Sequence, residues 1–379
     1  MRPLAFIFLV LACVGFAFSH ELNTLYAPGV GARAMGMGGA FVAASGDPSC
    51  IYWNPAGLAG IRKPMASLEG WRMWGRSQVE KSYYDPMRED YVYGPPSSAD
   101  HSGLGLAAVV FPVTQATFAL STYIPYENSL WDGDSIVQGS AIRKGMESRV
   151  LRSSFAAATE VSFSHGSRLS LGLEVYADRL RYQRSSVASI FPWSVTKVQG
   201  NGYGFQSGIL FQPTEEAAFG FAIQGQSLLN AEGSARYPSQ HGDSVYVSSV
   251  TMAAKLPTLV KVGIRLTSKP LVFEWDLAMR TSEMGGRTIY YYDAGIPYAT
   301  TPLQRAGMEI EVIRGLWLRG GAYYMYDGQQ SSEPVFFTGG LGLERWGFHA
   351  NGAIERTFGS KVHEQTTRAT LGLTYALGK

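Results

Sequence analysis

Residues 29–60 read GVGARAMGMGGAFVAASGDPSCIYWNPAGLAG, and this stretch is unlike the rest of the chain. It contains eight glycines and only two charged residues, Arg33 and Asp47. Glycine at this density costs backbone entropy on folding unless tight turns or close backbone contacts require it. We therefore expect this stretch to pack closely inside a structure that the remainder of the chain builds around it.

The first 19 residues have the features of an export signal. Arg2 supplies a positive charge, residues 4–18 form an unbroken apolar run, and small residues precede His20 at the positions that a signal peptidase reads. The run is shorter than the ~20 residues that a membrane-spanning helix needs. We expect cleavage before His20; the alternative is lipoprotein processing at Cys13, which would leave an apolar new terminus.

The composition of the mature chain predicts an exported all-β protein. Removal of Arg2 leaves 31 basic and 30 acidic residues, so there is no electrostatic case for binding nucleic acid. Cys50 remains as a single cysteine, which excludes an intramolecular disulfide and a cysteine-based zinc site. Glycine, tyrosine and phenylalanine number 44, 21 and 19, charged residues make up only 16%, and amphipathic helical patterns are almost absent.

A two-residue alternation recurs along the rest of the chain. Side chains alternate faces along a β-strand. In 260–267, valine, isoleucine and leucine share one face, while Lys261, Gly263, Arg265 and Thr267 share the other. About fourteen segments show this pattern. They lie near 65–74, 103–112, 115–124, 150–163, 167–181, 200–211, 216–226, 257–267, 270–280, 302–313, 315–326, 334–344, 346–357 and 366–376.

Short and long connections alternate between these segments. The short ones span a few residues, such as 165–166 and 268–269, whereas the longest of the others include 227–256 and 281–301. Outer-membrane barrels show this pattern, with short periplasmic turns and longer outer loops. An even number of strands would place both ends of the wall on the periplasmic side.

A closed membrane barrel competes with a soluble β-sandwich or propeller. The segments are long for a sandwich, aromatic residues gather near their ends, and mid-segment charges such as Glu274 and Glu309 suit a wet interior. No repeat of constant length supports a propeller. We predict a transmembrane antiparallel β-barrel of about 14 strands over 65–379, with 20–64 as an amino-terminal plug segment inside its lumen and 1–19 as the signal peptide.

The glycine-rich stretch resembles the amino-terminal signature of the FadL-like (FadL/TodX) outer-membrane transporter superfamily. Its pattern is closest to that of the PorV/PorQ-like members, which read G-A-R-A-x-G-M-G-G-A-[FY] followed by W-N-P-A-G-L; residues 31–41 and 53–58 carry it. The resemblance implies a Gram-negative outer-membrane location, a plugged fourteen-stranded barrel, and passage of hydrophobic molecules by way of a lateral opening. For PorV-like members it implies instead a shuttle or scaffold role in type IX secretion.

Two groups of residues are candidates for a functional site. Pro55 fixes its own φ and biases Asn54 towards extended geometry, so that the Asn54 amide can close a turn or bond the barrel wall. Mixed charges on the polar strand faces more often form a salt-bridged network that fixes a plug than a selective constriction. The plug or gate candidates are Asn54, Pro55, Ala56, Trp53, Gly38 and Gly39, and the lumen charges are Lys261, Arg265, Glu274, Asp276, Arg280, Glu309 and Glu311.

The sequence gives little support for an enzyme. The serine and histidine neighbours His101–Ser102 and His165–Ser167 lie at a loop or turn, and His349 with Asn351 has no evident partner serine, so we expect no hydrolase site. No residues have metal-ligand spacing. The G-x-G-x-x-[GA] match at 29–34 lacks the βαβ unit of a dinucleotide site. We expect no catalytic residues, metal or cofactor.

Two functions remain open from the sequence. The first is a channel that passes hydrophobic small molecules, of the long-chain fatty acid type, with capture by the long loops 227–256 and 281–301. The second is a PorV-like scaffold for type IX secretion without small-molecule transport. The expected partners are outer-membrane lipid and either a hydrophobic ligand or secretion-system proteins. A continuous apolar pocket between plug and wall would favour transport, and a fully packed, salt-bridged lumen would favour the scaffold.

Overall fold

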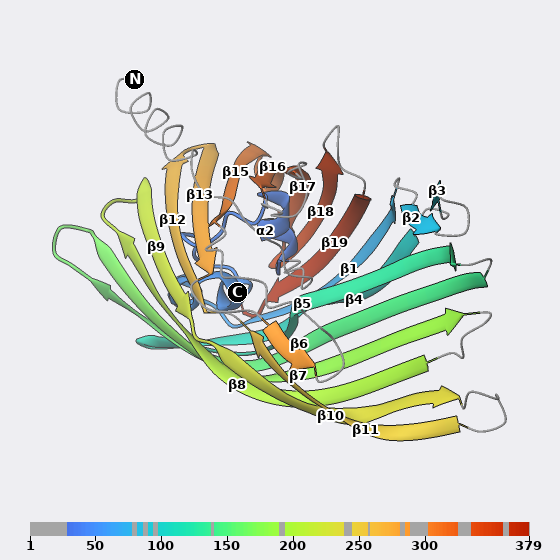
Figure 1. Cartoon of the computed structure of the whole chain (residues 1–379). Helices are drawn as coiled ribbons and strands as arrows, with labels where there is room; N and C mark the ends of the chain where they lie inside the picture. The colour runs from blue at the N-terminus through green and yellow to red at the C-terminus, as the bar shows by residue number, and fades with distance from the viewer. Residues whose placement is uncertain are drawn as a thin grey trace.

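Fourteen antiparallel strands close into a barrel in the computed structural model, which describes residues 29–77, 82–85, 90–93, 98–137, 140–188, 194–238, 245–256, 258–280, 285–288, 302–324, 335–358 and 364–378 (Figure 1). The circuit closes because the first strand pairs with both the second and the last, with Met65 opposite Ala376 at its end. The predicted fold class is therefore confirmed. Signal residues 1–19 and plug residues 20–28 lie outside the described residues.

The strands of the wall follow one another around the barrel in chain order. They are β1 (Met65–Ser77), β4 (Ser98–Val113), β5 (Ala116–Val137), β6 (Ser140–Ser162), β7 (Arg168–Ala188), β8 (Ser194–Gln212), β9 (Ala217–Gln224), β12 (Leu259–Ser268), β13 (Leu271–Arg280), β15 (Pro302–Ile313), β16 (Leu316–Tyr324), β17 (Val335–Arg345), β18 (Phe348–Phe358) and β19 (Glu364–Ala376).

Apolar side chains face outward and small or polar side chains face inward along the wall. On β9, Phe219 and Phe221 are exposed, whereas Ala218 and Ala222, which flank this pair, are buried. Soluble proteins show the reverse pattern, because water covers their outer surface. An exposed apolar band with a buried polar interior is what a lipid-embedded barrel requires. Among the described residues, no helix is long and apolar enough to span a membrane.

The wall has a turn end and a loop end. The turn end holds Met65, Ala376 and the short connections, such as the two residues between β15 and β16, where Gly315 has a φ of 80° that favours glycine. At the loop end β5, β6, β7 and β8 are 22, 23, 21 and 19 residues long, so they continue well past the other strands.

Several predicted loops are strands in the structure. Within 227–256, β10 (Ser227–Pro238) and β11 (Val245–Leu256) pair with each other as a hairpin. On its other side β10 pairs with β8, and β11 pairs with the short β14 (Gly285–Thr288). Much of 125–149 and 182–199 likewise extends β5 to β8. These stretches lack a continuous outward apolar face because they project beyond the apolar band, so the alternation that reveals the wall fades there. A separate hairpin joins β2 (Ser82–Asp85) and β3 (Asp90–Tyr93).

The amino-terminal segment, residues 29–61, lies inside the turn-end half of the barrel (Figure 1). It contains α2 (Ala32–Gly36), α3 (Cys50–Trp53) and the 3-10 helix η1 (Pro55–Gly60). Phe41, Ile51 and Leu58 are fully buried against inward side chains of the wall such as Leu106 and Val110. These short helices make few bonds of their own, so the wall must satisfy much of their backbone.

Candidate functional site

Carboxylates of the wall bind backbone N–H groups of the amino-terminal segment. One oxygen of Asp276 accepts from the amides of both Phe41 and Val42, and Glu274 accepts from the Ala43 amide at 2.8 Å. On β1, Glu69 accepts from the Ala32 amide at 2.9 Å, in the first turn of α2. The first amides of a helix have no partner within it, so a carboxylate there satisfies a donor that would otherwise be buried unpaired.

Cationic and amide side chains of the wall bind the segment's carbonyl oxygens in turn. The Lys261 ammonium donates to the carbonyls of Tyr52 at 2.8 Å and Trp53 at 3.4 Å, and Gln206 donates to Tyr52 at 3.1 Å. Tyr52 and Trp53 end α3, where helix carbonyls lack internal partners. The mixed signs of the inward charges thus match the donors and acceptors of one buried backbone.

Ion pairs tie the segment to β15 and β16. Glu309 accepts from Arg33 of the segment at 2.7 Å and from Arg319 of the wall at 2.6 Å. Arg265 pairs with Glu274 at 3.0 Å. Removing one partner from such a buried set leaves an uncompensated charge, which is costly.

The predicted lumen charges do not all belong to this network. Lys261, Glu274, Asp276 and Glu309 contact the amino-terminal segment, and Arg265 pairs with Glu274 of this set. Glu311 instead accepts from the Gly315 amide at 2.9 Å and so closes the β15–β16 turn. The side chain of Arg280 lies outside the described part of the structure.

Asn54 joins the segment to β8. Its amide nitrogen donates to the carbonyls of Val42 at 2.8 Å and Ile209 at 3.1 Å, and its oxygen accepts from the Ala56 amide at 3.1 Å. The backbone of Asn54 is extended, with φ −158°, and Pro55 starts η1 directly after it. Asn54 therefore both closes a turn and bonds the wall. The β7–β8 ladder is continuous at this level, so Asn54 does not stand beside a gap.

Gly39 packs against Trp53 within the segment, and Gly38 packs against the wall at Ala306 and Ala322. Both glycines have positive φ, 67° and 71°, and a Cβ on Gly39 would lie 2.9 Å from the Trp53 ring. Trp53 donates its indole N–H to the Val30 carbonyl at 2.7 Å, and the Arg305 guanidinium lies 4.9 Å from the centre of its ring. A side chain at either glycine would strain the backbone and displace this packing.

A row of wall glycines forms the seat of the segment, and the sequence analysis missed it. A Cβ on any of them would fall on segment atoms: on Gly208 it would strike the Asn54 oxygen, and on Gly307 or Gly321 the backbone of Met37. The sequence did contain a signal: these glycines occupy inward positions of strands that show the two-residue alternation, and glycine within a strand marks a close approach of another backbone. The members are Gly172, Gly208, Gly220, Gly263, Gly307, Gly321 and Gly340.

Cys50 is fully buried in the segment, and its thiol donates to the Ala44 carbonyl at 3.6 Å. Burial away from water raises the pKa of the Cys50 thiol, so the group stays protonated at neutral pH. We expect no alkylation of the folded protein by a maleimide at pH 7 and full alkylation after denaturation, both read by mass spectrometry. Rapid labelling of the folded protein would show that the segment leaves its seat.

The wall is interrupted between β4 and β5. Their pairing ends at Leu106 opposite Tyr123. Towards the loop end from there, β4 stays with β1, and β5 resumes pairing with β6 only at Tyr126. Pro125 lies at the point of separation; it has no N–H to give to a ladder, which is why proline ends or bends strands. We call this separation the wall break.

Side chains fill the wall break from the lumen side. Ile124 and Trp71 are both nearly buried, and a Cβ on Gly103 would contact each of them. Arg149 of β6 pairs with Glu127 of β5 at 2.7 Å. The same guanidinium donates to the Ser102 carbonyl of β4 at 3.3 Å, so it bridges the two edges of the break.

Above the amino-terminal segment, the lumen changes from polar to apolar. A buried polar layer comes first, in which Tyr123 donates to Glu174 at 2.7 Å and Arg152 pairs with Asp178 at 2.7 Å. Beyond it lies an apolar cluster on β5 to β8 and the β10–β11 hairpin, which we call the loop-end cluster. Its members are Tyr126, Val150, Leu180, Val198, Leu229, Ala231, Val250 and Leu256. Tyr126 is thus shared by this cluster and the edge of the wall break.

Residues 8–270 match the family described as outer membrane protein transport protein (OMPP1/FadL/TodX). The chain belongs to this family. It is therefore a transport-family barrel of the outer membrane and is grouped with channels rather than enzymes. The match does not bear on the likeness to PorV, which still rests on the glycine-rich stretch alone. No curated protein sequence matched the chain.

Solved structures of this family share the fold at low sequence identity. A Pseudomonas aeruginosa FadL homologue superposes with a TM-score of 0.75 at 16% identity, covering 94% of this chain and 100% of its own. The Ralstonia pickettii toluene transporter TbuX gives 0.67 at 16% identity, with 93% and 99% covered. The P. putida toluene transporter TodX gives 0.69 at 12%, with 93% and 100% covered.

Proposed function

We propose that this barrel passes hydrophobic small molecules across the outer membrane and releases them sideways through the wall break. The single observation that carries the proposal is the loss of β4–β5 pairing beyond Leu106 and Tyr123. An unpaired edge in lipid is costly unless protein covers it, so a break retained in a membrane wall indicates a use. The loop-end cluster supplies an apolar surface that reaches this break through Tyr126.

The amino-terminal segment would serve as the plug of this channel. The segment fits closely against the wall glycines and forms buried bonds to Asp276, Lys261 and Glu309. This packing argues against an open water-filled path along the barrel axis. A fully packed, salt-bridged lumen is the feature that the sequence predicts for the scaffold role, and this packed segment meets that criterion. The wall break lies beside and above that layer, however, so a hydrophobic molecule can leave the lumen without displacing the segment.

The similar solved structures suggest two candidate classes of ligand. Two of the similar solved structures are toluene transporters, and a third is a homologue of FadL. We propose that this chain takes hydrophobic compounds of that general kind, with a long-chain fatty acid and a monoaromatic hydrocarbon as the candidates. A PorV-like secretion role remains the second candidate, favoured only by residues 31–41 and 53–58.

Uptake by whole cells tests the proposal. A Gram-negative host that lacks its own hydrophobic-compound barrels would express the full chain, and uptake of labelled oleate and of labelled toluene would be measured separately. We expect one or both to enter faster than in cells that carry an empty vector. Equal uptake of both probes in the two strains, with the barrel present in the outer membrane, would reject transport and leave the scaffold role.

A further inference from the structure

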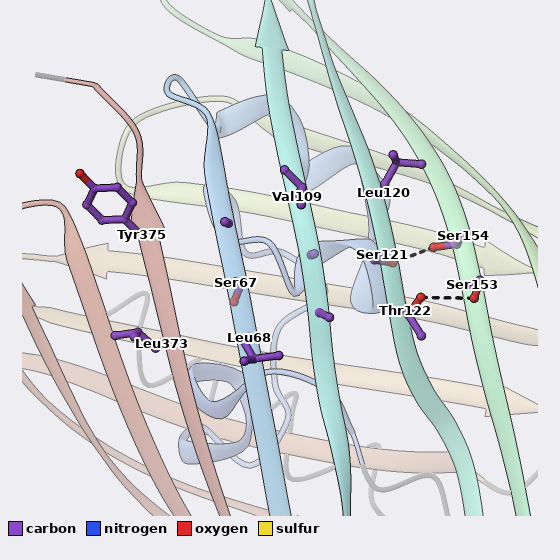
Figure 2. Close-up of a pocket in the computed structure, with 13 residues that line it drawn as sticks. Ser67, Leu68, Val109, Leu120, Ser121, Thr122, Ser153, Ser154, Leu373 and Tyr375 are labelled. Atoms are coloured by element: carbon purple, nitrogen blue, oxygen red, sulfur yellow. Dashed lines mark hydrogen bonds between the residues drawn. The ribbon is translucent and has the colours of Figure 1, made fainter.

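A groove lies on the outer face of the wall, directly on the turn-end side of the wall break. It has a volume of about 590 Å³ and runs across β19, β1, β4, β5 and β6. Ala66 and Ala107 are the small residues that line it. Figure 2 shows the larger lining residues Leu68, Val109 and Leu120 on three neighbouring strands. Because Leu68 and Leu120 are 64% and 56% exposed, this is a lipid-facing surface and not part of the lumen.

The groove is continuous with the wall break. Ala107 pairs with Thr122, and this pair is adjacent to Leu106 and Tyr123, the last pair before β4 and β5 separate. A molecule that leaves the lumen between these strands therefore meets the groove as its first outer surface.

Two hydroxyl groups lie at the end of the groove that is closer to the break. Thr122 and Ser153 are hydrogen-bonded to each other at 3.2 Å on the outer face (Figure 2). A second pair, Ser121 and Ser154 at 2.8 Å, is buried on the inner side of the same strands. Unlike the inner pair, the outer pair is within reach of a molecule in the lipid. Each hydroxyl has one donor hydrogen and two acceptor lone pairs, so the bond between Thr122 and Ser153 leaves donor and acceptor capacity for a ligand.

We propose that this groove is a release site, which holds the hydrocarbon chain of a departing amphiphile with its single polar group at Thr122 and Ser153. The inference rests on the proposed function, because the occupant arrives through the wall break. The site favours a chain with one hydrogen-bonding end over a hydrocarbon without polar atoms, since only the former uses the hydroxyl pair. A full groove slows re-entry into the lumen by covering the outer side of the break.

The test combines photolabelling with uptake in cells expressing the full chain. The probe is a long-chain fatty acid that carries a diazirine on its chain. We expect it to label outward residues of β1 and β4, with Leu68 and Val109 as the sites. Ala107→Phe fills the groove and should lower both labelling there and uptake severalfold. Ser207→Phe, which adds the same side chain to the outer face of β8, is the matched control and should change neither.

The outcomes separate the groove from the transport function. If Ala107→Phe takes up the probe as fast as the wild type does, the release site is wrong and the proposed transport function is unaffected. No uptake of the probe or of toluene by the wild type would reject the transport function itself. In that case, labelling of the groove would mark an ordinary lipid contact, and the release site would fall as well.

Discussion

Replacing Gly321 by valine will unseat the amino-terminal segment while the wall remains able to assemble. A Cβ at this position would overlap the backbone of Met37 and Gly38, and backbone atoms held by other bonds cannot move aside as a flexible side chain can. Overpacking of this kind costs about 1–3 kcal/mol, and we expect the upper part of that range here. Alkylation of Cys50 by a maleimide in the assembled barrel is the measurement.

The neighbouring glycine provides the control for this prediction. Gly320 faces outward, and a Cβ on it would meet no atom within 4 Å. Gly320→Val therefore adds the same side chain to the same strand without touching the segment, and Cys50 should remain protected. Equal protection of Cys50 in Gly320→Val and Gly321→Val would mean that the wall glycines are not the seat of the segment.

Loss of the Asp276 carboxylate will destabilise the segment by a different route. In Asp276→Ala the amides of Phe41 and Val42 lose their shared acceptor inside the barrel. A buried donor left without a partner costs about 1–3 kcal/mol, so two such donors make this among the most damaging single changes. Lys261, which is buried nearby in the same network, would lose a neighbouring opposite charge.

Asp276→Asn separates the hydrogen bonds from the charge. Both amides bond to one oxygen of Asp276, so the single oxygen of asparagine can still accept from each. We expect Asp276→Asn to keep most of the protection of Cys50 and most of the heat resistance of the barrel, and Asp276→Ala to lose both. Similar losses in the two variants would show that the charge of Asp276, and not its role as acceptor, holds the segment.

The wall could be predicted from the sequence because lipid and lumen impose opposite demands on alternate residues. Ile264 must be apolar to face lipid, while Lys261 and Gly263 face the segment. The extensions of β5 to β8 escaped prediction because they lie beyond the band of outward apolar residues. Their buried apolar residues, such as Leu180 and Val198, face the loop-end cluster instead. On β8, for example, Lys197 and Gln199 are exposed and interrupt the outer face, so no outward apolar row marks this part of the strand.

The candidate site was predicted in part. The role of Asn54 could be predicted because it depends on neighbouring residues: Pro55 has a fixed φ and biases Asn54 towards an extended backbone, from which its amide can close a turn. The glycine seat and the wall break could not be predicted, because both depend on which strands are neighbours and on where the segment lies against them. Gly208 reads as a weak strand residue until Asn54 is placed opposite it. The predicted segment 115–124 ends directly before Pro125, but the separation of β4 from β5 beyond it could be found only from the strand register.

Closing the wall break tests the central claim most directly. In a Cys50→Ala background, Ser102→Cys with Arg149→Cys places thiols on β4 and β6 where the Arg149 guanidinium now reaches across to the Ser102 carbonyl. A flexible bismaleimide would tie β4 to β6 across the break, and the same variant capped with a monofunctional maleimide is the control. We predict that uptake of labelled oleate or toluene falls to the empty-vector level only in the cross-linked protein. Undiminished uptake after complete cross-linking would contradict release through the break.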